Sequence, residues 1–469
     1  MNAMIKVFNP SAPEDKIAAE LFEAAIDLPL ICPHTHVDPH LFSDPAARFS
    51  NPSALFVTPD HYVVRMLISQ GIQFEQLGIF PVSEKDHEGD PREIWQLFCE
   101  HFDLFDGTPS GLWIRNALSM VFGISEKPQV ENAGELYDRI ESALRDPAFS
   151  PRRLFEKFNI EVLCTTDSAL DTLDTHDQIR ASGWKGDVRP TLRPDALIQI
   201  ERPGWVADID QLSQVSGINI RHFSDYLEAL RQRRAVFKAK GATAIDLGVE
   251  TPYTCRLSTM EADALFQKGL LGENDRGEAD QFRGLMIYEM ARMSLEDGLV
   301  MQLHAGSYRN HNPQVYETYG SDRGFDIPVG VEWTRNLKPL LDSFGMDPRL
   351  RLILFTLDET GYSRELAPLA GAYPAIRLGP PWWFHDSPEG MLRYFDTVVE
   401  TAGFTNLVGF NDDTRAFLSI PARHDLWRRM SALWLAKLVQ RGQLSMSTAR
   451  LRMADLAYGL AKRGYRLEA

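Results

Sequence analysis

The clearest pattern along the chain is a series of short apolar runs, each separated from the next by a segment with the 3.6-residue spacing of a helix. Eight runs have the length and composition of buried strands, at residues 28–32, 160–165, 188–192, 244–249, 299–304, 350–357, 375–378 and 407–410. Segments between them, such as residues 222–238, 280–296 and 388–402, are predicted to be helical. Eight strands that alternate with helices indicate parallel β/α units, and they predict an α/β fold of the (β/α)8 or TIM-barrel type.

Three stretches lie outside this alternation. Residues 40–155 show no strand pattern and are predicted to be a helical insertion after the first strand, with helices at residues 61–70, 91–102, 110–122 and 133–145. The C-terminal tail is predicted to be helical at residues 424–441 and 446–463. At the other end, Ser11 and Glu14 have the spacing of a capping box, which predicts a helix through about residue 27. Residues 1–469 are therefore expected to form a single barrel domain that contains the insertion.

Composition narrows the class of protein. Hydrophobic residues make up 44% of the chain and charged residues 24%, as in a soluble globular protein. The net charge of −16 argues against nucleic acid and anionic membranes as partners. The four cysteines are widely separated and form no C-x-x-C motif, so we expect a reduced, cytoplasmic setting. No stretch approaches the roughly 18 apolar residues of a membrane span.

Ligand-type residues follow the predicted strands, which is where β/α barrels carry their functional groups. His34 and His36 come directly after the first run, and because side chains alternate along a strand, both imidazoles are expected to point the same way. Two imidazoles on one face form half of a typical metal site, although an isolated His-x-His could equally be a solvated turn. The other runs are followed by Asp167, Arg193, Asp195, Asp246, Glu250, His304, Arg309, Asp358, Glu359, His385, Asp412, Asp413 and Arg415. A purely structural role does not account for so many ionisable residues at strand ends.

The positions of His34, His36, His304 and Asp413 resemble the amidohydrolase superfamily of metal-dependent barrels. A narrower resemblance is to the uronate isomerases, and its motifs run in order from about residue 10 to residue 440. They are the segments at residues 27–31, 60–65, 165–167, 193–195, 301–310, 382–384, 390–393, 413–419 and 423–424. Each motif alone is weak, but their number and order identify the chain as a member of this family.

The resemblance implies aldose–ketose isomerisation of a hexuronate, with D-glucuronate becoming D-fructuronate and D-galacturonate becoming D-tagaturonate. It implies that His34, His36 and Asp413 hold a divalent metal, with zinc the favoured ion and His304 as a fourth ligand or a substrate contact. The catalytic residues it implies are Asp413, Arg415, His61 and Tyr62. The substrate-binding residues it implies are Arg193, His304, Arg309, Trp382 and Trp383.

Some alternatives remain open at this stage. His61 and Tyr62 could simply begin a helix, and the two tryptophans could be core aromatics. The chain also departs from the family pattern at Leu247, where a histidine is expected, and through the additional acids Asp358, Glu359 and Asp412. A diverged hydrolase or decarboxylase of the same superfamily, acting on another carboxylate, is therefore the alternative function. We expect a homo-oligomer, and the sequence leaves open which sugar acid and which metal are bound.

Overall fold

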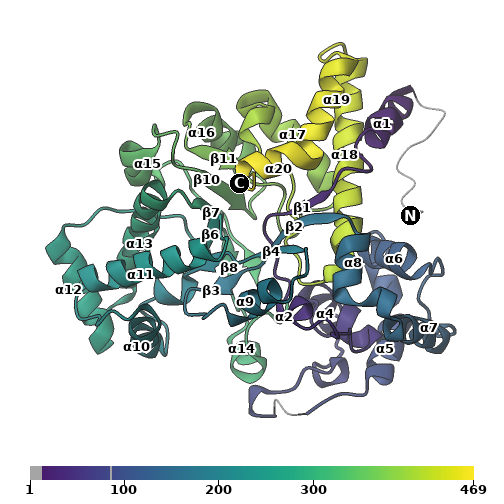
Figure 1. Cartoon of the computed structure of the whole chain (residues 1–469), viewed down its shortest axis with the longest axis horizontal. Coiled ribbons are helices and arrows are strands. Elements are labelled where there is room, and N and C mark those ends of the chain that lie inside the picture. The colour runs from purple at the N-terminus through teal and green to yellow at the C-terminus, as the bar shows by residue number, and fades with distance from the viewer. Residues whose placement is uncertain (1–12, 85–86, 469) are drawn as a thin grey trace.

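A computed structural model describes residues 13–84 and 87–468 and has the α/β organisation that the sequence predicts (Figure 1). The strands of its two main sheets are β1 (Leu30–Cys32), β2 (Ile160–Cys164), β3 (Asp167–Ser168), β4 (Asp187–Arg189), β5 (Leu192–Arg193), β6 (Ala244–Val249), β7 (Val300–Ala305), β10 (Leu352–Thr356) and β11 (Ile376–Leu378). All neighbouring strands in these two sheets are parallel, in the orders β1-β2-β4 and β11-β10-β7-β6-β5-β3. A small antiparallel pair, β8 (Ser307–Tyr308) with β9 (Ile327–Pro328), follows β7.

The predicted closed barrel is not observed, because the strands divide between two sheets. The predicted second strand forms as β2, but after an interruption at Thr165 the chain resumes as β3 in the other sheet. The predicted third strand is interrupted within its own bounds and divides into β4 and β5. Backbone hydrogen bonds still cross the interruption, from Thr165 N to Arg189 O at 2.9 Å and from Asp167 N to Thr191 O at 2.9 Å. These two stretches of chain therefore run side by side through both sheets.

The predicted eighth strand, residues 407–410, is also not formed as a strand. Leu407 makes only an isolated parallel bridge to Leu378. Gly409 has φ +74°, which is left-handed backbone that cannot continue an extended strand. A Cβ atom at this position would lie 3.0 Å from Ala461 N, so the chain passes close to the C-terminal helices there. The left-handed conformation at Gly409 explains why these four apolar residues do not form a hydrogen-bonded β-strand.

The helices between residues 40 and 155 fill the stretch where no strand was expected. They are α2 (His40–Ser43), α3 (Pro52–Phe56), α4 (His61–Ile68), α5 (Pro91–Glu100), α6 (Pro109–Phe122), α7 (Ala133–Arg145) and α8 (Pro151–Lys157), and the described residues of this stretch hold no strand. Asp60, Asp90 and Thr108 begin α4, α5 and α6 by accepting backbone N–H groups. The apolar core of these helices also includes Leu30 and Leu163 from β1 and β2, so it is continuous with the first sheet.

The remaining helices surround the sheets. Before β10 they are α1 (Pro13–Glu23), α9 (Asp174–Ala181), α10 (Trp205–Ser216), α11 (Phe223–Ala239), α12 (Thr259–Leu271), α13 (Arg276–Asp297), α14 (Pro313–Tyr319) and α15 (Lys338–Phe344). After β10 they are α16 (Ala367–Ala372), α17 (Pro388–Ala402), α18 (Ile420–Gln440), α19 (Met446–Ala454) and α20 (Leu460–Gly464). Figure 1 places α10 to α13 on one side of the strands and α5 to α8 on the other. Ser11 of the expected capping box lies outside the described residues.

Helix α18 is the central helix of the C-terminal part, and it packs against α1 (Figure 1). Fourteen of its residues are buried, so it is enclosed on most of its surface. Buried Arg428 donates to Ile26 O, Leu28 O and Pro29 O at 3.0, 2.7 and 3.1 Å. This contact satisfies the carbonyl groups of the segment that enters β1, and so it helps to fix where His34 and His36 emerge. In the described part of the chain, no helix is long and apolar enough to cross a membrane.

Candidate active site

A cavity of about 780 Å³ opens at the carboxyl ends of the parallel strands. All the side chains that the sequence singles out for the site contribute to its lining: His34, His36, His61, Tyr62, Arg193, His304, Arg309, Trp382, Trp383, Asp413 and Arg415. They come from the loop after β1, from α4, β5 and β7, and from three further loops, and they span almost 400 positions of the chain. The fold therefore brings the whole predicted set into one space, although their individual roles stay predictions.

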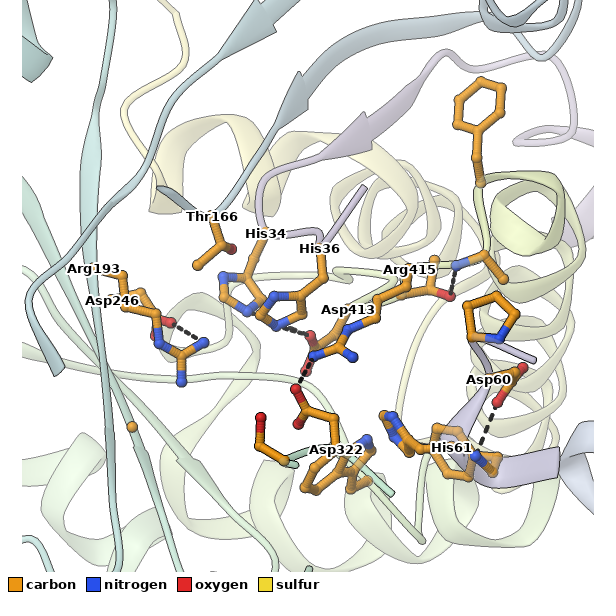
Figure 2. A pocket seen from close by; sticks show the side chains of 18 of the residues that line it. His34, His36, Asp60, His61, Thr166, Arg193, Asp246, Asp322, Asp413 and Arg415 are labelled. Atoms are coloured by element: carbon orange, nitrogen blue, oxygen red, sulfur yellow. Dashed lines mark hydrogen bonds and ion pairs between the residues drawn. The ribbon is translucent and has the colours of Figure 1, made fainter. Parts of the chain in front are cut away.

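His34, His36 and Asp413 converge at one end of this cavity (Figure 2). The Nε2 atoms of His34 and His36 lie 3.4 and 3.2 Å from the same oxygen of Asp413, Oδ1. The two segments are joined through their backbones, by Asp413 N to His34 O at 3.3 Å and His36 N to Thr414 O at 3.0 Å. Asp413 has φ +40°, an uncommon conformation for a residue other than glycine, and such strain is concentrated at functional sites.

The charges of this group are set by burial and by the neighbouring partners. Burial alone would raise the pKa of Asp413, but His34 and His36 outweigh it and hold that pKa well below its usual range. Burial works to lower the pKa of His34, yet Asp246 and Asp413 raise it above its ordinary value. For His36 burial prevails, and its pKa is lowered. Asp413 is thus a carboxylate at neutral pH.

The ligand atoms of these three residues fit a metal ion. One atom from each of His34, His36 and Asp413 lies within 4.8 Å of the others, as ligands around a common ion do. Two imidazole nitrogens and one carboxylate oxygen are ligands that suit zinc and related divalent ions, and three protein ligands leave a position open for substrate. The donor set therefore supports a divalent metal at this end of the cavity without identifying the ion.

His304 stands next to this group and is held by a carboxylate. Its ring stacks on that of His34 with 4.8 Å between centroids, and its Nδ1 lies 2.6 Å from Asp246 Oδ1. That contact uses Nδ1, so the other ring nitrogen, Nε2, is available to a ligand. Nε2 is buried and has no hydrogen-bond partner among the described residues. Asp246 also lies 3.3 Å from Arg193 NH1. Burial would raise the pKa of Asp246, but His304 and Arg193 lower it well below its ordinary value.

Six arginines bring positive charge to the cavity lining, and five of them are paired with an acid. Arg193 donates to Asp195 at 2.7 Å, Arg309 to Asp326 at 2.8 Å, and Arg415 to Asp322 at 2.7 Å. Arg423 donates to Asp386 at 3.1 Å and stacks 3.6 Å from the Trp113 ring centroid. The Arg415 side chain points toward Asp322 (Figure 2). A negatively charged ligand would thus meet guanidinium groups that are already held in position.

His61 and Tyr62 are the first residues of α4, as expected if they simply begin a helix, and they also line the cavity. Neither His61 Nε2 nor Tyr62 OH has a hydrogen-bond partner among the described residues, although both atoms are buried. Burial and the nearby Arg415 lower the pKa of His61 to about 3, so the ring is neutral. Burial and Asp386 raise the pKa of Tyr62 well above its ordinary value, so the phenol keeps its proton. Two unsatisfied polar groups beside a cavity are suited to bind a polar ligand.

The two tryptophans form one wall of the cavity. Trp382 and Trp383 stack with an interplanar angle of 2° and 5.6 Å between their centroids. Trp382 packs edge-on against His304, and Trp383 packs against His61. Arg309 lies 5.1 Å from the Trp383 ring centroid. The tryptophans therefore contact the other candidate residues directly, whichever role they have.

The departures from the family pattern lie away from the cavity lining. Leu247 is fully buried in the main core. Asp358 accepts from Thr360 N at 2.9 Å, and Glu359 pairs with Arg393 at 2.9 Å. Asp412 is buried beside His424. These extra acids therefore add no negative charge to the cavity surface itself.

Several lining residues were not predicted as part of the site. Asp322 lies in the loop between α14 and β9, where no motif marks it, and only the fold brings it to Arg415. Asp60 was included in a family motif but was not predicted to line the site. Its place directly before α4 is that of an N-cap residue, which was the available signal. Asp246 was noted at a strand end but given no role. A carboxylate in the middle of an apolar strand, where a charged side chain is costly to bury without a partner, was the available signal.

A parallel α/β fold with a His-His-Asp group at the strand ends, in a cavity lined by arginines, defines an enzyme built to bind an anionic substrate beside a divalent metal. A family profile described as glucuronate isomerase matches residues 11–465. The uronate isomerase of Nostoc punctiforme is 53% identical over 99% of this chain and 98% of its own length, and that of Rhizobium meliloti is 50% identical over 96% of each chain. The crystal structure of glucuronate isomerase from Caulobacter crescentus has a TM-score of 0.96 and 46% identity, and covers 100% of this chain and 98% of its own.

The chain belongs to the glucuronate isomerase family. The predicted family and the predicted activity, aldose–ketose isomerisation of a uronate, are thereby confirmed. The hydrolase or decarboxylase alternative is not needed.

Proposed function

We propose that this chain interconverts a hexuronate aldose and its ketose in the 780 Å³ cavity, with D-glucuronate and D-galacturonate as substrates. The observation that carries this proposal is one cavity that combines a metal-type donor set, whose Asp413 carboxylate can also act as the base, with several arginines and a Tyr62 hydroxyl that has no hydrogen-bond partner among the described residues. Isomerisation requires a proton to move between C2 and C1, a polarised carbonyl, and a cationic partner for the substrate carboxylate. Each requirement has a candidate in the lining.

We infer that His34, His36 and Asp413 hold a divalent metal, with zinc favoured by the two imidazole ligands. His304 Nε2, buried and with no hydrogen-bond partner in the described part of the chain, is positioned to be a further ligand or to bind a substrate oxygen. When bound, such a metal polarises the oxygens of a sugar and lowers the pKa of their protons. The carboxylate of Asp246 would hold His304 in the tautomer that leaves Nε2 available.

We assign the proton transfer to Asp413 and Tyr62. Asp413 is ionised at neutral pH because two histidines lower its pKa, so it can accept the proton from C2. Tyr62 remains protonated, and its hydroxyl, which has no hydrogen-bond partner among the described residues, can donate to the carbonyl oxygen at C1 to give the enediol. The proton on O2 then returns to Tyr62 while Asp413 delivers its proton to C1, which gives the ketose. Neutral His61 contacts Tyr62 with 4.9 Å between ring centroids and supplies a second unpartnered group for a sugar hydroxyl.

We assign recognition of the substrate carboxylate and its neighbouring oxygens to Arg415, Arg193 and Arg309. A guanidinium group can bond both oxygens of a carboxylate at once, which an ammonium group cannot do with fixed geometry. Asp195, Asp326 and Asp322 hold these arginines in position through hydrogen bonds. When the substrate carboxylate binds, some of the guanidinium N–H groups would have to bond to it in place of these acids. Trp382 and Trp383 would form the apolar wall against one face of the sugar.

We further propose that residues 1–469 form one domain based on an interrupted (β/α)8 barrel, with residues 40–155 inserted after its first strand. Support comes from hydrogen bonds that join residues 407–414 to β11 on one side and to the segment after β1 on the other. These bonds run from Val408 N to Leu378 O at 3.1 Å and from His36 N to Thr414 O at 3.0 Å. A homo-oligomer and a cytoplasmic setting remain our expectations. The four free cysteines, three of them buried, suit the latter.

The test is a proton NMR time course in D2O with metal-supplemented protein and each hexuronate in a separate tube. We expect ketose signals, with deuterium at C1 where the transferred proton exchanges with solvent. Asp413→Asn should abolish turnover and Tyr62→Phe should lower kcat. Glu359→Gln is the matched control, because this acid pairs with Arg393 outside the cavity. Full activity of Asp413→Asn would refute the assignment of the base.

A further inference from the structure

A second group of metal-type ligands lies outside the cavity lining, and the proposed reaction does not use it. Cys32, Asp412 and His424 come from the end of β1, the segment after the Leu407 bridge, and the first turns of α18. Their exposed fractions are 0%, 2% and 2%. One ligand atom from each lies within 4.8 Å of the others. Cysteine, histidine and aspartate are three ligand types that zinc and cobalt share.

The distances within this group are those of ligands around a shared ion. Cys32 Sγ lies 3.7 Å from His424 Nε2, and the same Nε2 lies 3.3 Å from Asp412 Oδ2. Around a tetrahedral ion with bonds of about 2.0 Å to nitrogen or oxygen and about 2.3 Å to sulfur, neighbouring ligand atoms are roughly 3.3 to 3.6 Å apart. Hydrogen bonding alone explains the group less well. The Cys32 thiol and His424 Nε2 can both donate to Asp412, yet Asp412 Oδ1 keeps no hydrogen-bond partner among the described residues.

Charge balance points the same way. Asp412 Oδ1 is buried and has no hydrogen-bond partner among the described residues. Among these residues, His424 is the one ion-pair partner of the Asp412 side chain. The nearby Arg428 donates to backbone carbonyl groups instead. A buried carboxylate without a cation is costly. A divalent ion with one thiolate, one carboxylate and one neutral imidazole gives a group with no net charge, and Oδ1 of Asp412 can provide the fourth contact.

We propose that Cys32, Asp412 and His424 bind a second divalent ion of the zinc type, buried beneath the catalytic cavity. Binding releases the thiol proton of Cys32 to solvent, so the ion is bound by a thiolate. Cys32 is two residues before His34, and Asp412 directly precedes Asp413. The ion therefore ties together β1, the segment after Leu407 and α18, and it fixes the two segments that carry the candidate catalytic ligands.

Cobalt substitution distinguishes the two sites, because only the second contains sulfur. Full-length protein prepared with Co2+ should hold two ions per chain and show a thiolate-to-cobalt charge-transfer band in the near ultraviolet. We expect His34→Ala to lose one ion and keep the band. Cys32→Ser should lose one ion together with the band. Cys164→Ser, which changes another buried cysteine in β2 outside the group, should keep both ions and the band.

A triple variant with serine at Cys99, Cys164 and Cys255 covers the case in which Cys32→Ser does not fold. Cys32 is then the only remaining cysteine, and the charge-transfer band must persist. Absence of the band in wild-type protein, or its loss in the triple variant, overturns the proposal and leaves Cys32, Asp412 and His424 as a hydrogen-bonded group. Because the readout is spectroscopic, it does not depend on whether hexuronates are turned over.

Discussion

The ion pair between Arg415 and Asp322 gives the sharpest test of how the cavity binds an anion. Asp322 accepts from Arg415 at 2.7 Å inside the cavity, and Arg309 lies 3.9 Å from its other oxygen. The carboxylate thus occupies the guanidinium groups that we assign to the substrate carboxylate. Burial would raise the pKa of Asp322, but Arg415 lowers it, so the side chain is charged at neutral pH and competes with the substrate. We predict that Asp322→Asn lowers KM.

The magnitude follows from the exposure of the pair. The side chains of Arg415 and Asp322 are 41% and 29% exposed, so solvent screens their attraction and the pair contributes about 0.5 to 1 kcal/mol. Removing this competition should lower KM by about twofold to fivefold, with kcat changed less. Asparagine is the suitable replacement because Asp322 has φ +62°, a left-handed conformation that asparagine tolerates.

The assay is steady-state kinetics with D-glucuronate at low and high salt. Salt should reduce the difference between wild type and Asp322→Asn, because it already weakens the ion pair in the wild type. Asp342→Asn is the matched control, since this acid pairs with Lys338 on α15 and not with a cavity residue. A higher KM in Asp322→Asn, or an unchanged KM with a large fall in kcat, would show that Asp322 positions Arg415 and does not compete with the substrate.

Three further predictions concern other parts of the structure. Burial lowers the pKa of His385 to about 4, whereas the unfolded chain binds this proton below about pH 6.5, so folding stability should fall as pH drops from 6.5 to 4. The loss is about 2 kcal/mol at pH 5, and chemical denaturation should show a shallower pH dependence in His385→Gln; an equal slope would contradict this. Gly248→Ala should raise KM severalfold, because its Cβ would lie 2.6 Å from Arg193 NH2, while Gly330→Ala, which meets nothing within 4 Å, should not. Chelation should lower the thermal midpoint of the wild type by removing bound metal, and a midpoint insensitive to chelator would argue against the metal sites.

Local sequence pattern was sufficient wherever a segment's structure depends on its own residues. Helices α7 and α17 begin and end where the apolar spacing predicts, and β6 has the predicted bounds, because periodicity and capping act within a few residues. The motifs around His34 and Asp413 identified the family for the same reason, since each motif is short and continuous. The predicted site residues could therefore be named from the sequence once the family was recognised, although other lining residues such as Asp322 could not.

The tertiary structure decided everything that depends on contacts between distant segments. The run at residues 407–410 has the composition of a strand, but its close approach to the C-terminal helices turns the chain at Gly409. The pairing of Asp322 with Arg415 joins positions 93 apart, and that of Cys32 with His424 joins positions 392 apart. No local propensity encodes such pairs. They arise because burying the apolar faces of strands and helices fixes the whole backbone, and the backbone then determines which side chains meet.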